Sequence, residues 1–256
     1  MATALIATLL VALYLWWWQP AEPIVAAEPV AQAATVSDKP PMPAAAAISH
    51  ALDPEPAAEP LPYLDGSDLP LGEALSAVVG AKPWKALFNP ERVIRRIVAT
   101  VDNLPRQQAP VKMWPVRPTG AWFETAASGD VLTVSPSNSR RYAAYVGLVQ
   151  TVEVVKLVAI YRHFYPLFQQ AYVDLGYPKG YFNDRLVVAI DDLLAAPELV
   201  ESPQLVQRKV LYEYADTDLE GRSAGQKIML RIGSGNARIV KARLREFRSA
   251  VATSPK

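Results

Sequence analysis

Hydrophobic and polar positions divide the chain into three parts. Residues 2–18 are apolar apart from two threonines and one tyrosine, and they carry no charge. Residues 19–62 are rich in proline and alanine and show no periodic apolar pattern. From residue 63 onward, apolar residues recur at the spacing of helices and short strands. The pattern predicts an N-terminal transmembrane helix (2–18), a disordered linker (19–62) and a soluble domain (63–252).

The soluble domain is predicted to be mainly helical. Its apolar stripes recur every three or four residues between capping and stop signals, which is typical of amphipathic helices. The predicted helices cover approximately residues 68–79, 89–102, 135–149, 151–175, 183–194, 223–232 and 234–251.

Individual residues set the predicted helix boundaries. Asn89-Pro90-Glu91 is typical of a helix start, with a capping side chain and proline at the first helical position. In the helix that follows, Asp102 falls on the mostly outward, polar side. Asn183 is predicted to cap the helix at 183–194. Pro166 lacks an amide N–H and clashes with the preceding turn, so we expect it to kink or break the longest helix.

The β-structure is predicted to be minor. Trp122-Phe123 and residues 131–134 flank Ser128-Gly129-Asp130, a spacing that predicts a small hairpin. Residues 205–214 alternate enough to form a strand or an extended piece. Residues 104–120 contain four prolines and predict an exposed loop. The expected fold class is therefore mainly α with a minor β-hairpin, behind the membrane helix and linker.

The first segment favours an uncleaved membrane anchor. Its residues would span about 26 Å as a helix, just short of a hydrocarbon core of about 30 Å. Three tryptophans at 16–18 mark one water boundary, where indole rings concentrate. A cleaved secretory signal is the alternative, but it would begin with a basic residue, and no Lys or Arg precedes this core. A lipid bilayer contacted through residues 2–18 is thus one expected partner.

The linker is acidic and of low complexity. It holds 10 of the chain's 23 prolines and 13 alanines, and its charged residues sum to −5. With few groups to bury, such a segment does not offset its ordering entropy. Because the whole chain carries +1, the soluble domain carries +6. A long acidic spacer suits a domain that reaches away from a membrane. We therefore expect a single-pass protein of the bacterial inner membrane with a periplasmic domain.

Candidate chemistry is sparse. The 256 residues contain no cysteine, which excludes disulfides, thiolate catalysis and Cys-ligated metals. There is no nucleophile elbow, P-loop, dinucleotide fingerprint or His-rich metal pattern, so no cofactor, metal or catalytic residue is predicted. Asp184 with Asp191 or Asp192 would suit acid–base cleavage of cell-wall glycan. We favour the alternative, in which Asp184 assists a helix start and the other two are solvated.

The last helix carries cationic residues close together on one side. A basic face is predicted from Arg238, Lys241, Arg245 and Arg248, which fall within about 80° of helical arc. Such a face would bind anionic lipid, an acidic protein, anionic polymer or nucleic acid, or would only keep the surface soluble. Nucleic acid is the least favoured of these partners.

Seven segments together resemble an uncharacterised bacterial family, domain of unknown function 3014. They are LPYLDGSD at 61–68, ATVDNLPR at 99–106, YPL at 165–167, LGYP at 175–178, YFNDRL at 181–186, KVLY at 209–212 and SAGQK at 223–227. The resemblance implies membrane-anchored proteins with the same three-part layout, and no established activity.

The resemblance also directs attention to eight polar residues as a candidate binding site. They are Asp102, Asn103, Arg106, Asn183, Asp184, Arg185, Lys209 and Lys227. Our hypothesis is that part of this set converges on one polar surface. Charge reversal at Arg106 or Arg185 should then abolish partner binding without unfolding the domain.

The sequence therefore favours a membrane-tethered envelope protein that acts as a binding or scaffold module. A tethered, carboxylate-based hydrolase of cell-wall glycan is the first alternative. A cytoplasm-facing binder of anionic lipid or nucleic acid is the second. Catalysis is not the favoured interpretation, and the expected soluble partner is an acidic envelope protein or an anionic polymer.

Overall fold

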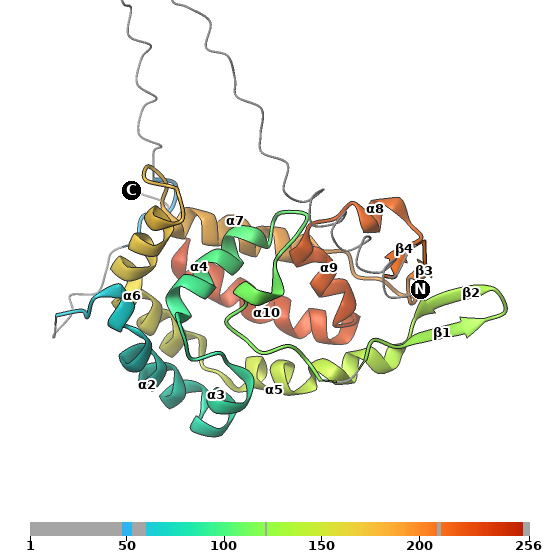
Figure 1. Cartoon of the computed structure of the whole chain (residues 1–256), viewed down its shortest axis with the longest axis horizontal. Coiled ribbons are helices and arrows are strands. Elements are labelled where there is room, and N and C mark those ends of the chain that lie inside the picture. Colours follow the sequence, from blue (N-terminus) through green and yellow to red (C-terminus); the bar gives the residue numbers. More distant parts are fainter. Residues whose placement is uncertain (1–47, 53–59, 121, 209–210, 253–256) are drawn as a thin grey trace, which may run out of the picture. The chain divides into compact units, whose positions relative to one another are not determined.

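The computed structural model describes residues 48–52, 60–120, 122–208 and 211–252. The predicted anchor, and residues 19–47 and 53–59 of the predicted linker, lie outside these ranges. Ala45–Lys256 forms one compact unit. Its described part is mainly helical with one small antiparallel sheet, which confirms the predicted fold class for the soluble domain (Figure 1).

The elements follow one another along the chain with short connections. The longer helices are α2 (Asp68–Val79), α4 (Val93–Asn103), α5 (Ala143–Thr151), α6 (Val154–Asp174), α7 (Phe182–Leu194), α9 (Ala224–Arg231) and α10 (Ser234–Val251). The shorter helical pieces are η1 (Leu64–Gly66), α3 (Ala81–Leu87), η2 (Val111–Met113), η3 (Pro136–Tyr142) and α8 (Thr217–Glu220). The strands are β1 (Thr125–Ser128), β2 (Val131–Val134), β3 (Gln204–Val206) and β4 (Glu213–Tyr214).

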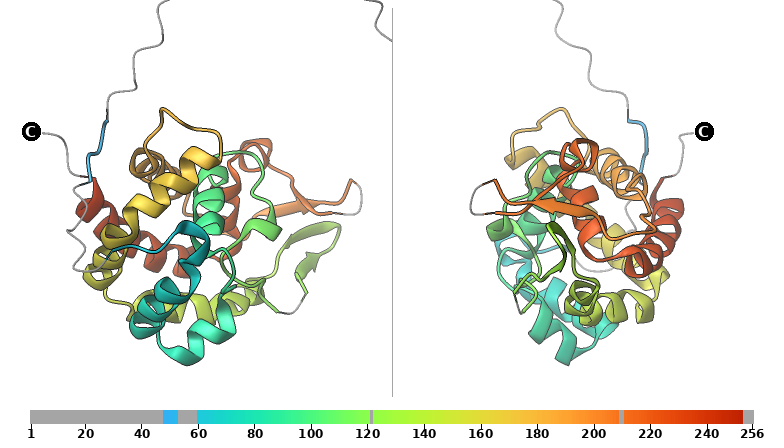
Figure 2. Two further views of the ribbon diagram at one scale, coloured as in Figure 1. Left: turned by 60° about the vertical axis from the view of Figure 1, so that its left-hand side comes forward. Right: turned by 90° about the vertical axis from the view of Figure 1, so that its right-hand side faces the viewer.

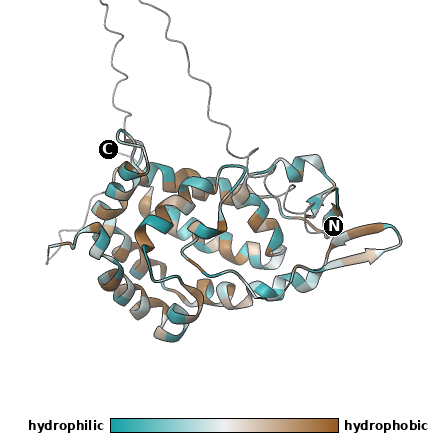
Figure 3. Ribbon diagram, viewed as in Figure 1, coloured by the Kyte–Doolittle hydropathy of each residue, from teal (hydrophilic) through white to brown (hydrophobic). Residues whose placement is uncertain are grey.

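The main core lies between α2, α4, α6, α7 and α10. These helices pack against one another, and buried apolar residues from each of them meet in the core. Hydrophobic and hydrophilic residues alternate along the helices (Figure 3). Phe182 is fully buried and its ring stacks on Phe168, with centroids 5.6 Å apart. Tyr161 and Tyr172 are buried beside these rings, so the helical tyrosines serve as core residues.

Pro166 does not break the longest helix. α6 continues from Val154 to Asp174 with Pro166 inside it. Of the predicted kink or break, the break is therefore wrong, and the kink stays a prediction. The proline lies on the exposed side, while the buried stripe runs through neighbours such as Phe164 and Leu167. Packing of that stripe offsets the hydrogen bond that the proline removes. The sharp bend, 85°, comes instead between α5 and α6.

The start of α4 differs from the predicted one. The helix begins at Val93, and its N-cap Arg92 has a positive φ of 52°. Asp68, at the first turn of α2, accepts hydrogen bonds from the amides of Arg92 and Val93 at 2.6 and 2.8 Å. The Asn89 side chain donates instead to the carbonyl of Trp114 at 3.1 Å. A carboxylate distant in sequence therefore replaces the predicted local cap.

The sheet has the strand order β1-β2-β3-β4, with every neighbouring pair antiparallel. The predicted hairpin is confirmed, with its first strand a few residues later than expected. Gly129 adopts a positive φ of 58° at its turn. The hairpin extends away from the helices (Figures 1 and 2). A second apolar cluster joins the sheet to α8 and α9.

Among the described helices, none by itself has the length and hydropathy of a membrane span. Pro136–Thr151 and Val154–Asp174 pass that test only as a bent pair.

Candidate functional site

Asp102 is the centre of a buried ionic cluster at the end of α4. Its side chain is 7% exposed, and Oδ1 accepts a hydrogen bond from Nε of Arg185 at 3.0 Å. Oδ2 accepts one from Nη2 of Arg106 at 2.8 Å and one from the hydroxyl of Tyr177 at 3.2 Å. Both arginines also donate to the main-chain carbonyl of Asp102. The buried negative charge is thus matched by cations and by hydrogen bonds.

The burial of Asp102 corrects the prediction that it faces outward. Asp102 lies four residues after Val98, so both project from the same side of α4. That side packs against α7, which supplies Arg185. The Asp102 carboxylate is tolerated between α4 and α7 because Arg185, on α7, pairs with it.

Arg106 presents a fixed cation at the surface. Its side chain is 50% exposed, although Nη2 also donates to the hydroxyl of Tyr177 at 2.6 Å. Its backbone carbonyl accepts a hydrogen bond from the amide of Ala224 at 2.6 Å, which joins this turn to α9. Coulombic attraction by Asp102 raises the pKa of Arg106. The guanidinium is therefore charged, oriented and still accessible to a partner.

The other predicted residues do not all join this cluster. Asn103 donates from Nδ2 to the carbonyl of Ala99 at 2.7 Å, within its own helix. Lys227, on α9, forms an ion pair with Glu220, on α8, at 2.6 Å. Lys209 lies outside the described residues. Of the eight residues, the structure brings Asp102, Arg106 and Arg185 together.

Asn183 and Asp184 instead hold a short segment that precedes the domain in sequence. We call residues 48–52 the strap. Both carboxylate oxygens of Asp184 accept strap amides, and Asn183 donates from Nδ2 to the carbonyl of His50 at 3.0 Å. Asn183 is completely buried and does not cap α7, so its predicted capping role is wrong. These two residues bind a peptide of the same chain.

The basic face of α10 is smaller than predicted. Lys241 is only 4% exposed, and its Nζ donates to the carbonyl of Ala196 at 2.6 Å. Arg248 forms a two-bond ion pair with Asp191, at 2.5 and 2.9 Å. Arg238 and Arg245 remain exposed. Part of the predicted basic face lies against α7 and the segment after it, where Lys241 and Arg248 bond to oxygen atoms.

The three carboxylates considered for acid–base chemistry have separate partners. Asp184 binds the strap, Asp191 pairs with Arg248, and Asp192 accepts hydrogen bonds from Ser223 at 2.6 Å and Gln226 at 3.0 Å. Each therefore has a structural role in this arrangement. No group of three or more metal-ligating side chains occurs within the part of the chain that the structure describes.

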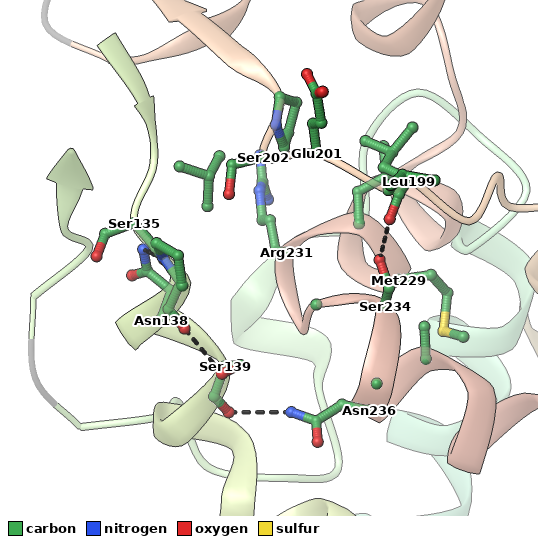
Figure 4. Close-up of a pocket in the computed structure, with 18 of the residues that line it drawn as sticks. Ser135, Asn138, Ser139, Leu199, Glu201, Ser202, Met229, Arg231, Ser234 and Asn236 are labelled. Atoms are coloured by element: carbon green, nitrogen blue, oxygen red, sulfur yellow. Dashed lines mark hydrogen bonds between the residues drawn. The ribbon is translucent and has the colours of Figure 1, made fainter. Parts of the chain in front are cut away.

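A cleft of about 280 Å³ lies beside the joint between α9 and α10 (Figure 4). Figure 4 shows Asn236 donating to the carbonyl of Ser139, and Ser234 donating to that of Leu199, at 3.0 and 2.5 Å. Gly233, between the predicted helices at 223–232 and 234–251, has a positive φ of 86°. Ser234 is the first residue of α10, and its hydroxyl bonds outside that helix. The sequence hypothesis did not foresee this cleft.

The fold and cluster define a mainly helical domain with a small antiparallel sheet, organised around a buried aspartate shared by two arginines. Residues 93–248 match the family model described as "Protein of unknown function (DUF3014)". The match covers more than half of the chain, so the protein belongs to that family. No curated protein and no solved structure matches it significantly.

Proposed function

We propose that this protein is a membrane-tethered binding module of the bacterial envelope that contacts an acidic partner through the surface around Arg106. The apolar segment 2–18 supplies the anchor, and the acidic linker gives the domain its reach. The domain itself lies outside the cytoplasm and acts as a scaffold rather than as an enzyme.

The observation that carries the proposal is the position of Arg106. Burying Asp102 has a desolvation cost, which its two arginine partners offset. Arg185 is mostly buried and serves that purpose, whereas half of the Arg106 side chain faces solvent. An arginine held in one orientation loses less conformational entropy on binding than a mobile one. A carboxylate or phosphate group on the partner would accept its remaining N–H groups.

The test compares two single-charge deletions in intact membranes. Arg106→Gln removes the proposed contact, and Arg245→Gln removes an exposed arginine from the basic face of α10. Each variant is cross-linked in situ, and cross-linked proteins are identified by mass spectrometry. Thermal unfolding of each purified variant checks that the domain remains folded.

The proposal predicts a discrete cross-linked species that persists in Arg245→Gln and disappears in Arg106→Gln. Loss in Arg245→Gln alone would place the contact on the basic face. An identical pattern in the wild-type chain and both variants would refute the proposal.

A further inference from the structure

The strap is recognised through its backbone. The amide of Ser49 donates to Oδ2 of Asp184 at 3.1 Å, and the next amide, of His50, donates to Oδ1 at 2.7 Å. Asn183 then donates to the carbonyl of His50. The side chains of Asn183 and Asp184 thus bind two consecutive N–H groups and one carbonyl of the strap. This pattern accepts a peptide backbone that bends at these two residues, with little regard to its side chains.

One strap side chain adds an apolar anchor. Leu52 is 8% exposed and belongs to the main core cluster, together with Phe182 from the first turn of α7. Burial of a leucine contributes affinity that the backbone contacts alone do not provide. The ligand class is therefore a peptide that bends at the two donating amides and carries a leucine two residues after the carbonyl bound by Asn183.

The receiving side of this contact is held in place without the strap. The Phe182 amide donates to Oε1 of Gln169 on α6 at 2.8 Å. Asn183 donates to the carbonyl of Val251 at 2.9 Å, and its Oδ1 accepts the Tyr161 hydroxyl at 3.1 Å. Asp184 lies in the first turn of α7, where the helix dipole favours a negative charge. These bonds order the Asn183 side chain before any peptide arrives, and the helix terminus favours the charge of Asp184.

We propose that the first turn of α7 is a peptide-binding site, and that the chain's own strap occupies it as a detachable latch. Nδ1 of His50 is buried without a hydrogen-bond partner among the described residues, which opposes docking. The latch is therefore weaker than the hydrogen bonds to Asn183 and Asp184 suggest. Ser49 and Asp184 lie 135 positions apart, so closing the latch also has a loop-closure cost.

One consequence rests on the tether proposed above. If residues 19–62 form that tether, docking of the strap at residues 48–52 would shorten it, and the latch would set how far the domain searches from the membrane.

The direct test empties the site and refills it with a defined peptide. The double variant Ser49→Pro, His50→Pro removes both amide donors from the strap and leaves α7 unchanged. A fluorescent synthetic peptide of residues 45–53 is titrated into the full-length chain in detergent. We expect binding to the double variant at least tenfold tighter than to the wild-type chain, whose site is filled. Adding Asp184→Ala should abolish it. Equal binding, or none, across the three chains would overturn the proposal.

A second measurement uses the otherwise intact chain. Amide hydrogen exchange at Ser49 and His50 should be at least tenfold slower than in the free peptide. Asp184→Ala should restore the free-peptide rate, whereas Asp191→Ala, on the same helix but away from the strap, should not. Free-peptide rates in the wild-type chain would contradict the latch. Neither experiment involves a membrane or Arg106, so failure here leaves the proposed function standing.

Discussion

Asp102→Asn should destabilise the domain far more than removal of its exposed partner. Asparagine keeps the shape and one acceptor oxygen but removes the charge. Arg185, whose side chain is 21% exposed, then loses its counter-ion. Breaking a buried pair from one side costs about 3–5 kcal/mol, and the partial exposure of Arg185 favours the lower end, about 3 kcal/mol.

Arg106→Gln provides the contrast. This arginine pairs with Asp102 across one helical turn and is half exposed, so its loss should cost about 0.5 kcal/mol. For a domain of this size, each kcal/mol shifts the melting temperature by about 2–4 °C. We therefore expect a decrease of about 6–12 °C for Asp102→Asn and about 1–2 °C for Arg106→Gln.

Urea unfolding of the purified chain at pH 7 measures both free energies, and a double-mutant cycle adds the coupling. Asp102→Asn combined with Arg185→Gln should cost less than the sum of the single changes, because no uncompensated charge remains. The reasoning fails if Arg106→Gln costs as much as Asp102→Asn, or if the two changes at Asp102 and Arg185 simply add. Because Asp102 is buried against Arg185, charge reversal at Arg185 should unfold the domain, contrary to the sequence hypothesis.

Three further predictions concern other contacts. Gly225→Ala should cost about 1–3 kcal/mol in urea unfolding, because the new Cβ would lie 2.9 Å from a methyl group of Leu193; unchanged stability would show that α9 shifts freely. Lys241→Met should cost about 1–3 kcal/mol, because it leaves the Ala196 carbonyl without its donor; a neutral result would mean that another donor replaces it. Burial acts to raise the pKa of Glu220, but hydrogen bonds from Lys227 and a backbone amide outweigh it and lower that pKa. Its stabilisation should be complete above the unfolded pKa, near 4.5, and be lost as pH falls through the lower folded value. In Glu220→Gln that acid-dependent loss should shrink, as measured by thermal unfolding from pH 6 to pH 3.

Local signals in the sequence predicted most helices. α10 has the predicted bounds, Ser223 caps α9 through its hydroxyl, and Gly80 ends α2 with a positive φ of 91°. These features depend on residues within one or two turns of each other, so their information is present in short stretches. α3 and α8 were not predicted, because neither presents a long apolar stripe.

Contacts between distant segments were beyond the reach of such signals. Asp68 caps a helix that begins 25 positions later, and the strap meets α7 more than 130 positions away. No regular spacing in the sequence predicts either contact. The strap residues were assigned to the linker because their composition is that of the linker, yet Leu52 packs into the main core.

The candidate site was predictable only in part. The resemblance grouped Asp102, Arg106 and Arg185, but their spacing along the chain does not bring them together. Their meeting depends on the packing of α4 against α7. Packing of α10 against α7, beside Ala196, likewise buries Lys241, which helical periodicity alone placed on an exposed face.

The central claim is that residues 2–18 hold the folded domain outside the cytoplasm. Fusions of the C-terminus to one reporter active only outside the cytoplasm, and to another active only inside, test it most directly. The account predicts activity of the outside reporter alone. Activity of the inside reporter alone would contradict it and redirect the search to cytoplasmic partners of the exposed arginines.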